Sequence, residues 1–213
     1  REFYRGPRFD WSGMVASLAG GKHRWFGPWK TTPHDPAVCD DVTAIAGEFG
    51  MGVDGMPPPL NYDDAPEGGV FLKIGVGWER KIKEAGYRFG AGYEIVDTAP
   101  WRTKTGKRWV EFRQEMAPRE GYGYFYFKRI EVAEKGAKFT VYHSLRNTGS
   151  KTIRQTHYIH NFIALDGLPV GPEWRTSFPF EPKPRKDMKG MAAIEGRDLV
   201  IEGPPGTSKT TML

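Results

Sequence analysis

The sequence predicts an all-β protein, built as one large antiparallel β-sandwich with a loop-rich N-terminal section. Short segments of strand length, bounded by Gly, Pro, Asn, Asp or Lys-rich turns, follow one another from Val70 onward. Aromatic residues, which are common in sheets, make up 14% of the chain. No stretch after Val70 has a helical period. We therefore expect less than about a tenth of this part to be helix.

The composition is that of one globular domain, which we take to span residues 1–213. This length allows a substantial core, and 38% of the residues are hydrophobic. No apolar run approaches the roughly 20 residues of a membrane-spanning helix, so no membrane association is expected. The net charge of +5 is modest, and basic residues are mixed with carboxylates, as in WERKIKEAGYR (78–88). This pattern is typical of a solvated face and argues against a nucleic-acid partner.

A single cysteine, Cys39, excludes an internal disulfide framework and cysteine-based zinc sites. We expect no metal and no other cofactor. The chain begins at Arg1 without a methionine. Either a signal peptide has been removed, which would mean a periplasmic or secreted protein, or the chain has been trimmed. The compartment and the oligomeric state therefore stay open.

Residues 1–69 form the loop-rich section. Gly, Pro and Asp occupy turn positions in GPRFDWSG (6–13), TTPHDP (31–36) and DGMPPPLNYDDAPEGG (54–69). Long ordered loops often carry function, so candidate binding residues are expected here.

Residues 70–213 form the strand-rich section. Alternation is clearest in KFTVYHSLRN (138–147), where every second residue from Phe139 to Leu145 shares one face. The strand candidates are 70–81, 91–97, 108–116, 121–132, 138–147, 152–166, 191–196 and 198–203. Strands that follow one another without helices between them predict antiparallel pairing.

The closing GPPGTSKTT (203–211) resembles the phosphate-binding loop of a nucleotide hydrolase. Lys209 and Thr210 have the right types to contact phosphate and Mg²⁺. However, the helix and the parallel sheet of such an enzyme would have to follow, and only Thr211, Met212 and Leu213 come after Thr210. We favour a Pro-Gly turn between two strands, which implies a sandwich that is truncated at its C-terminus. A nucleotide hydrolase stays as a less favoured alternative.

The most informative stretch carries His157 and His160. Because strand side chains alternate, His157 shares a face with Asn161, whereas His160 shares the other face with Tyr158 and Phe162. Without a β-bulge the two imidazoles cannot serve one metal site. Each histidine alone is either a hydrogen-bonded structural residue or a functional one.

The segment NTGSKTIRQTHYIHNFIALDG (147–167) resembles the central strand pair of the galactose mutarotase (aldose 1-epimerase) superfamily. In that family an Asn-Thr turn precedes a strand with a His-x-Tyr/Phe-Phe motif, which is followed by Leu-x-Gly. The segments YRGPRFDWSG (4–13), EGGVFLKIGVG (67–77) and VGPEWRTSFPF (170–180) are also similar to a bacterial branch of mutarotase-like proteins. The resemblance spans nearly the whole chain.

The resemblance implies a large antiparallel supersandwich and a reaction that interconverts the anomers of an aldose. His160 takes the place of the family's catalytic histidine, which acts as an acid, and Asn161 and Phe162 follow it in the motif. A histidine, with an ordinary pKa of about 6.5, can donate a proton near neutral pH. The family's base is a glutamate late in its chain, and this chain ends before that region.

Further candidates come from residue chemistry. Glu48 in AGEFG offers a second catalytic carboxylate. Arg, Asp and Asn hydrogen-bond sugar hydroxyls, and aromatic rings cover the apolar face of a sugar. The substrate-binding candidates are Arg8, Asp10, His34, Asp64, Trp78, Asn161 and Phe162. The carboxylates could equally cap turns, and the aromatic residues could equally pack in a core.

Two functions for a small-molecule sugar partner therefore compete. One is a mutarotase-like isomerase with His160 as the acid. The other is a carbohydrate-binding module on the same sandwich, without turnover.

Overall fold

The computed structural model describes residues 4–27, 35–42, 44–53, 55–136 and 138–168. Within these ranges it contains strands β1 to β11 and one 3-10 turn, η1 (Leu165–Gly167), but no α-helix. The predicted all-β antiparallel fold is thus confirmed for the described part. None of its elements is a long apolar helix able to cross a bilayer. The segment 203–211 and the candidate His34 lie outside the described residues.

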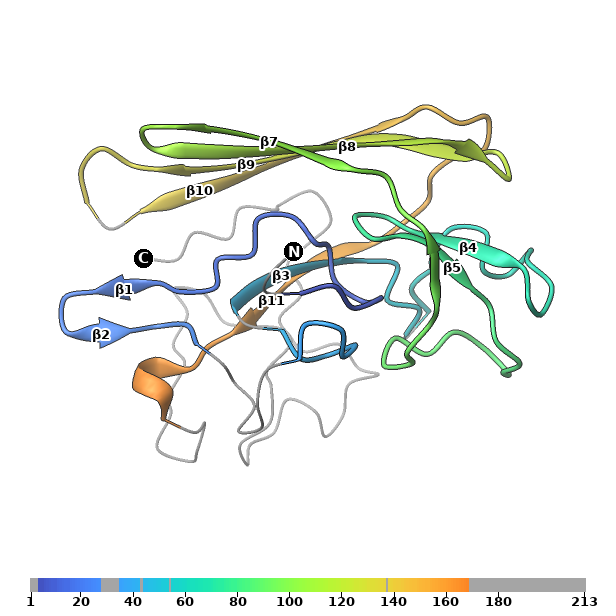
Figure 1. Cartoon of the computed structure of the whole chain (residues 1–213), viewed down its shortest axis with the longest axis horizontal. Helices are drawn as coiled ribbons and strands as arrows, with labels where there is room; N and C mark the ends of the chain where they lie inside the picture. Colours follow the sequence, from blue (N-terminus) through green and yellow to red (C-terminus); the bar gives the residue numbers. More distant parts are fainter. Residues whose placement is uncertain (1–3, 28–34, 43, 54, 137, 169–213) are drawn as a thin grey trace.

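One layer is a four-stranded antiparallel sheet in the order β10-β9-β8-β7 (Figure 1). Its strands are β7 (Trp101–Gly106), β8 (Trp109–Arg119), β9 (Tyr122–Val132) and β10 (Phe139–Asn147). Consecutive strands are neighbours because tight hairpins join them. Glu120 and Gly121 both have positive φ, 53° and 84°, as a two-residue hairpin turn requires.

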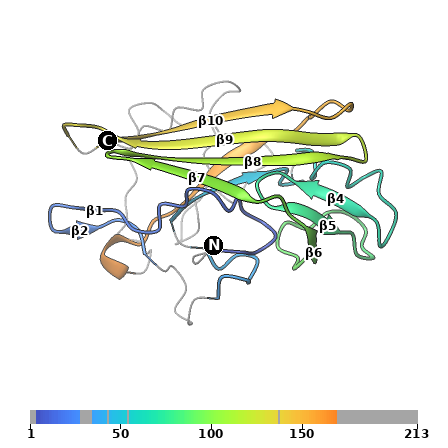
Figure 2. The same ribbon diagram turned by 45° about the horizontal axis from the view of Figure 1, so that its top comes forward.

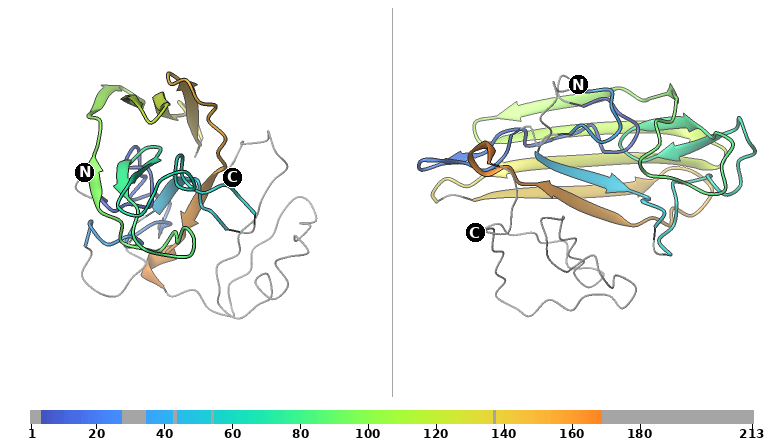
Figure 3. Two further views of the ribbon diagram at one scale, coloured as in Figure 1. Left: turned by 90° about the vertical axis from the view of Figure 1, so that its right-hand side faces the viewer. Right: turned by 90° about the horizontal axis from the view of Figure 1, so that it is seen from below.

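Two smaller sheets form the opposite layer. Strand β3 (Ala44–Phe49) pairs antiparallel with β11 (His157–Phe162). Beside this pair lies the three-stranded sheet of β4 (Val70–Lys73), β5 (Gly77–Arg80) and β6 (Ile95–Asp97). Figures 2 and 3 show both sheets on the same side of the four-stranded sheet, so the molecule is a two-layer sandwich. A short hairpin of β1 (Ala19–Gly20) and β2 (His23–Arg24) lies at one end.

The main core lies between the layers. The inward side chains of β8 and β9 meet those of β3, β4 and β5. The buried members of this cluster are Phe49, Leu60, Leu72, Ile74, Trp78, Ala99, Met116, Tyr124 and Tyr126. The hydroxyls of the two core tyrosines, Tyr124 and Tyr126, are hydrogen-bonded, and that of Tyr124 donates to Oε1 of Gln114 at 2.6 Å. This packing holds β3 and β11 firmly against the large sheet.

Four strands lie where the sequence predicted none: the short β1 and β2, and the longer β3 and β7. Strand β3 lies in the section predicted to be loop-rich. It was not predicted because Gly47 and the charged Glu48 interrupt its apolar pattern, although both residues are buried. Strand β7 is polar because it lies at the edge of the large sheet with most of its residues exposed. The predicted strand 152–166 is shorter than expected, since pairing with β3 begins at His157.

Candidate functional site

The β3–β11 pair sorts its side chains onto two faces. Its register is regular, with Tyr158 opposite Glu48 and His160 opposite Ala46. Alternation therefore places Glu48, Tyr158 and His160 on the outer face, which points away from the four-stranded sheet. His157 lies on the inner face, where its ring packs against Phe49 with 4.2 Å between ring centroids.

Glu48 is the centre of a buried polar cluster on the outer face. Its side chain is fully buried, and its Oε1 accepts a hydrogen bond from Nζ of Lys73 at 2.9 Å. Its Oε2 accepts from Nε of Arg8 at 2.9 Å and from the Tyr158 hydroxyl at 2.6 Å. Lys73 also donates to the Tyr87 hydroxyl at 2.9 Å. We call these five residues the Glu48 cluster.

The charges in the Glu48 cluster are balanced by direct contact. Burial, the largest effect, raises the pKa of Glu48, but the Lys73 and Arg8 cations and the Tyr158 hydrogen bond outweigh it. The pKa of Glu48 therefore lies below its ordinary value, and the group is an ionised acceptor. Burial raises the pKa of Tyr158, which keeps its hydroxyl protonated as a donor.

His160 lies next to this cluster in an aromatic setting. Its ring stacks on Phe162, with centroids 3.7 Å apart and planes 8° apart. The Phe9 ring meets it edge-on at 6.2 Å, and Tyr158 lies at 6.2 Å. The guanidinium of Arg8 lies over the Phe9 ring at 4.5 Å. An imidazole, a guanidinium and a carboxylate thus gather on one face with flat apolar surface beside them.

A second buried polar cluster lies on the inner face, between the layers. Asp10 is 1% exposed and forms an ion pair with Nζ of Lys128 at 2.7 Å. Its Oδ1 accepts from the Ser12 backbone and hydroxyl, and its Oδ2 accepts from the Tyr126 hydroxyl at 2.9 Å. The Tyr126 oxygen also contacts Nδ1 of His143 at 2.9 Å. We call these five residues the Asp10 cluster.

His157 adjoins the Asp10 cluster as a neutral, structural residue. Its ring centroid lies 5.1 Å from that of His143. Burial, with added repulsion from His143 and Lys128, lowers the pKa of His157 to about 3. Its Nε2 and the Oδ1 of Asn161 are buried without a hydrogen-bond partner among the described residues. Because side chains alternate along β11, Asn161 lies on the same inner face as His157 and not on the face of its neighbour His160.

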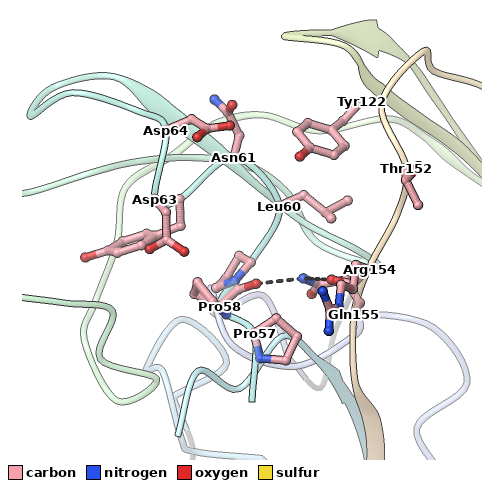
Figure 4. A pocket seen from close by; sticks show the side chains of 12 residues that line it. Pro57, Pro58, Leu60, Asn61, Asp63, Asp64, Tyr122, Thr152, Arg154 and Gln155 are labelled. Carbon is pink, nitrogen blue, oxygen red and sulfur yellow. Dashed lines mark hydrogen bonds between the residues drawn. The ribbon is translucent and has the colours of Figure 1, made fainter. Parts of the chain in front are cut away.

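Asp64 lies in a groove at the end of the sandwich (Figure 4). The close-up shows Asp63 and Asp64 at the left, Thr152 and Gln155 at the right, and Tyr122 above Pro57 and Pro58. This part of the groove has a volume of about 170 Å³. A larger part, of about 540 Å³, adjoins it and shares Asn61 and Asp64.

The structure thus brings together four of the predicted residues and separates the others. On the outer face of β3–β11 lie Arg8, Glu48, His160 and Phe162. Asp10 and Asn161 lie on the inner face, and Asp64 lies in the groove. Trp78 is 1% exposed within the main core, so its ring offers no face to a ligand.

Sequence reasoning missed the partners that hold these residues. Lys73 and Lys128 are almost fully buried, and each completes a cluster. A lysine inside an apolar run, as in VFLKIGV (70–76), is a signal that could have revealed a buried acid, because a buried ammonium needs a carboxylate. The hydroxyls of Tyr126 and Tyr158 gave no such signal, since tyrosine is common in ordinary cores.

One further acid, Glu79, is buried without a hydrogen bond from another described residue. Both of its carboxylate oxygens lack a hydrogen-bond partner among the described residues. Burial, the largest effect, and the nearby Glu48 raise its pKa well above the ordinary value, although Lys73 lowers it in part. Its buried surroundings therefore favour the protonated, neutral form of Glu79.

The described residues contain no group of three or more His, Cys, Asp or Glu side chains arranged to hold a metal ion. No protein-family model matches the chain, and neither a curated protein nor a solved structure is significantly similar to it.

Proposed function

We propose that this protein acts on carbohydrates as a mutarotase-like isomerase, with His160 as the general acid. One observation supports the proposal above all. The pairing of β3 with β11 puts Glu48 and His160 on one face, and Arg8 joins them there through its hydrogen bond to Glu48. Such a gathering of titratable side chains beside aromatic surface is typical of sugar sites.

The proposed reaction opens and recloses the sugar ring. His160 donates a proton to the ring oxygen while a base accepts the proton of the C1 hydroxyl. The bond between C1 and the ring oxygen breaks, and its electron pair stays on the oxygen, which gives the open-chain aldehyde. Rotation about the C1–C2 bond followed by the reverse proton transfers yields the other anomer. Phe9 and Phe162 are buried, with exposed fractions of 0% and 6%, so in this scheme they hold the His160 ring in position and the sugar is bound through hydrogen bonds.

In this scheme Glu48 acts as a positioning residue. Both its oxygens are occupied and its side chain has no exposed surface, so it orients Arg8 and Tyr158 rather than touching a sugar.

The bonding of both Glu48 oxygens also favours a second candidate function, carbohydrate binding without turnover. In that case His160 and Arg8 hydrogen-bond the sugar, and no described carboxylate on the face is free to accept the C1 proton.

The test compares His160→Ala with His157→Ala in the full chain. Anomer interconversion of freshly dissolved glucose and galactose is followed by polarimetry and by NMR saturation exchange. We expect His160→Ala to slow the reaction by roughly 10²–10⁴-fold, as for a positioned acid. His157→Ala should act on stability alone, because its ring lies on the inner face.

Equal losses from the two variants would contradict the assignment of the acid. Sugar binding without any catalysed interconversion by the unmodified protein would support the binding function instead. Glu48→Gln adds a second readout. We expect it to lower binding and thermal stability together, since Arg8 and Lys73 would lose their shared counter-charge.

A further inference from the structure

The groove at Asp64 is a second candidate site, separate from the outer face of β3–β11. Three segments meet there beside Arg80 of β5: residues 57–70, residues 151–155 and the β8–β9 hairpin with Tyr122. We call the two adjoining parts together the Asp64 groove. Neither the Glu48 cluster nor His160 lines it.

The polar side chains of the Asp64 groove carry both charges and are available to a ligand. Arg119, Arg154, Asp63 and Glu120 make no side-chain hydrogen bond or ion pair within the described part of the chain. Lys151 and Asp64 lie 3.4 Å apart and stay exposed, which makes their ion pair weak. A further basic residue of the lining, Arg80, is paired with Glu94 outside it. Donors and acceptors are thus interspersed with little excess charge. This arrangement suits a neutral ligand rich in hydroxyl groups better than an anion or a cation.

The walls of the groove are largely preformed. The three consecutive prolines from Pro57 to Pro59 restrict the backbone of one wall. Gln155 ties the opposite wall to it, because its Nε2 donates to the Pro58 carbonyl at 2.6 Å (Figure 4). The half-buried ring of Tyr122 adds an aromatic surface, and Nζ of Lys151 lies over this ring at 5.1 Å from its centroid, so a ligand that stacks on the ring must displace the ammonium. A preformed wall lowers the entropic cost of binding, and an aromatic ring can stack on the apolar face of a sugar.

The size and shape of the groove favour a chain of sugars over a single ring. The larger part alone, at about 540 Å³, is within the range of small-ligand sites. The smaller part continues from it through Asn61 and Asp64. A ligand that occupied both parts would extend past this junction.

We propose that the Asp64 groove binds a neutral oligosaccharide. This goes beyond the proposed isomerase, because the groove would bind its ligand equally in a protein without turnover at His160. It also gives Asp64, which the sequence singled out as a sugar contact, a site of its own.

The experiment uses the full chain on an array of neutral gluco-, galacto-, manno- and xylo-hexasaccharides, with oligogalacturonate as the anionic comparison. Titration calorimetry with the best binder then gives Kd. We expect Tyr122→Ala and Asp64→Asn each to weaken binding at least tenfold. Asp64 is exposed, so Asp64→Asn should fold normally even if Tyr122→Ala is destabilised. Tyr142→Ala, at an exposed tyrosine on β10, is the matched control and should leave Kd unchanged.

Three results would overturn the proposal: no binding to any hexasaccharide, binding that survives Asp64→Asn and Tyr122→Ala, or preference for oligogalacturonate. His160→Ala separates this proposal from the proposed reaction. We expect that variant to keep hexasaccharide binding whether or not anomer interconversion is lost. Loss of hexasaccharide binding in His160→Ala, with binding intact in the groove variants, would place the ligand on the outer face instead.

Discussion

Gly47 lies at a point of β3 where no side chain fits. A Cβ atom there would lie 2.9 Å from Nε2 of His157 and 3.8 Å from Oδ2 of Asp10. The His157 ring has little room to move, because Phe49 and His143 pack against it. The absence of a side chain therefore lets the inner face of β3 approach the Asp10 cluster.

We predict that Gly47→Ala lowers the free energy of unfolding by about 1–3 kcal/mol, as overpacking of a tight core usually does. Gly86→Ala is the control, because a Cβ there would meet nothing within 4 Å. Urea denaturation of both variants measures the difference. A Gly47→Ala protein as stable as Gly86→Ala would mean that His157 can move aside freely.

Glu79 makes stability depend on pH in an unusual direction. Its pKa is raised in the folded protein, whereas in the unfolded chain a glutamate titrates near pH 4.3. Between these two values the folded state binds one more proton than the unfolded state. The stabilising contribution is therefore complete below about pH 4.3 and is lost as the pH rises toward the folded pKa.

We predict that Glu79→Gln removes the fall in stability that Glu79 causes as the pH rises. The free energy of unfolding of the unmodified protein should fall relative to Glu79→Gln between pH 5 and pH 8, by up to about 1.4 kcal/mol per pH unit. Urea denaturation across that range checks it, with Glu67→Gln as a variant at an exposed glutamate. Parallel pH profiles for the unmodified protein and Glu79→Gln would show that Glu79 is ionised in the folded state.

At the scale of elements, alternation predicted the strands that have one apolar face. Strand β10 coincides closely with KFTVYHSLRN, and β11 has the predicted opposite orientation of His157 and His160. Strand β3 escaped prediction because its buried side chains include Glu48, whose burial depends on partners supplied by distant segments. Local sequence carries no record of such partners.

The same reason limits what the sequence says about the candidate site. Arg8, Glu48 and His160 were identified by residue chemistry and by the resemblance, and their shared face depends on which strands pair. Asn161 adjoins His160 in the motif yet lies on the opposite face, and Trp78 is enclosed by the core. The Asp64 groove depends on three segments meeting, so only Asp64 itself could be singled out in advance.

At the scale of the whole molecule, one N-terminal segment joins the two buried clusters. Arg8 points to Glu48 on the outer face, and Asp10, two residues later, points to Lys128 between the layers. This segment contributes to both faces of the β3–β11 pair.

We predict that Asp10→Asn destabilises the fold by about 3–5 kcal/mol, because it leaves the buried Lys128 ammonium without a counter-charge. The double variant Asp10→Asn with Lys128→Met should recover much of this loss. Glu94→Gln, which breaks the exposed pair with Arg80, is the control and should cost no more than about 1 kcal/mol. Urea denaturation of the unmodified protein, of Asp10→Asn and Lys128→Met singly, and of the double variant gives the coupling energy, and additive effects in the double variant would argue against a direct ion pair.

The position of this segment also bears on how the chain folds as it leaves the ribosome. Arg8 contacts Tyr158, which follows it by 150 residues, and Asp10 contacts Tyr126, which follows it by 116. At about 5–20 residues per second, roughly 8–30 s pass before the last of these partners has been made. During that interval the charged side chains of Arg8 and Asp10 are more stable in water than in a partly formed core that lacks their partners. A segment that is synthesised long before its partners is therefore among the last of the described segments to reach its folded position.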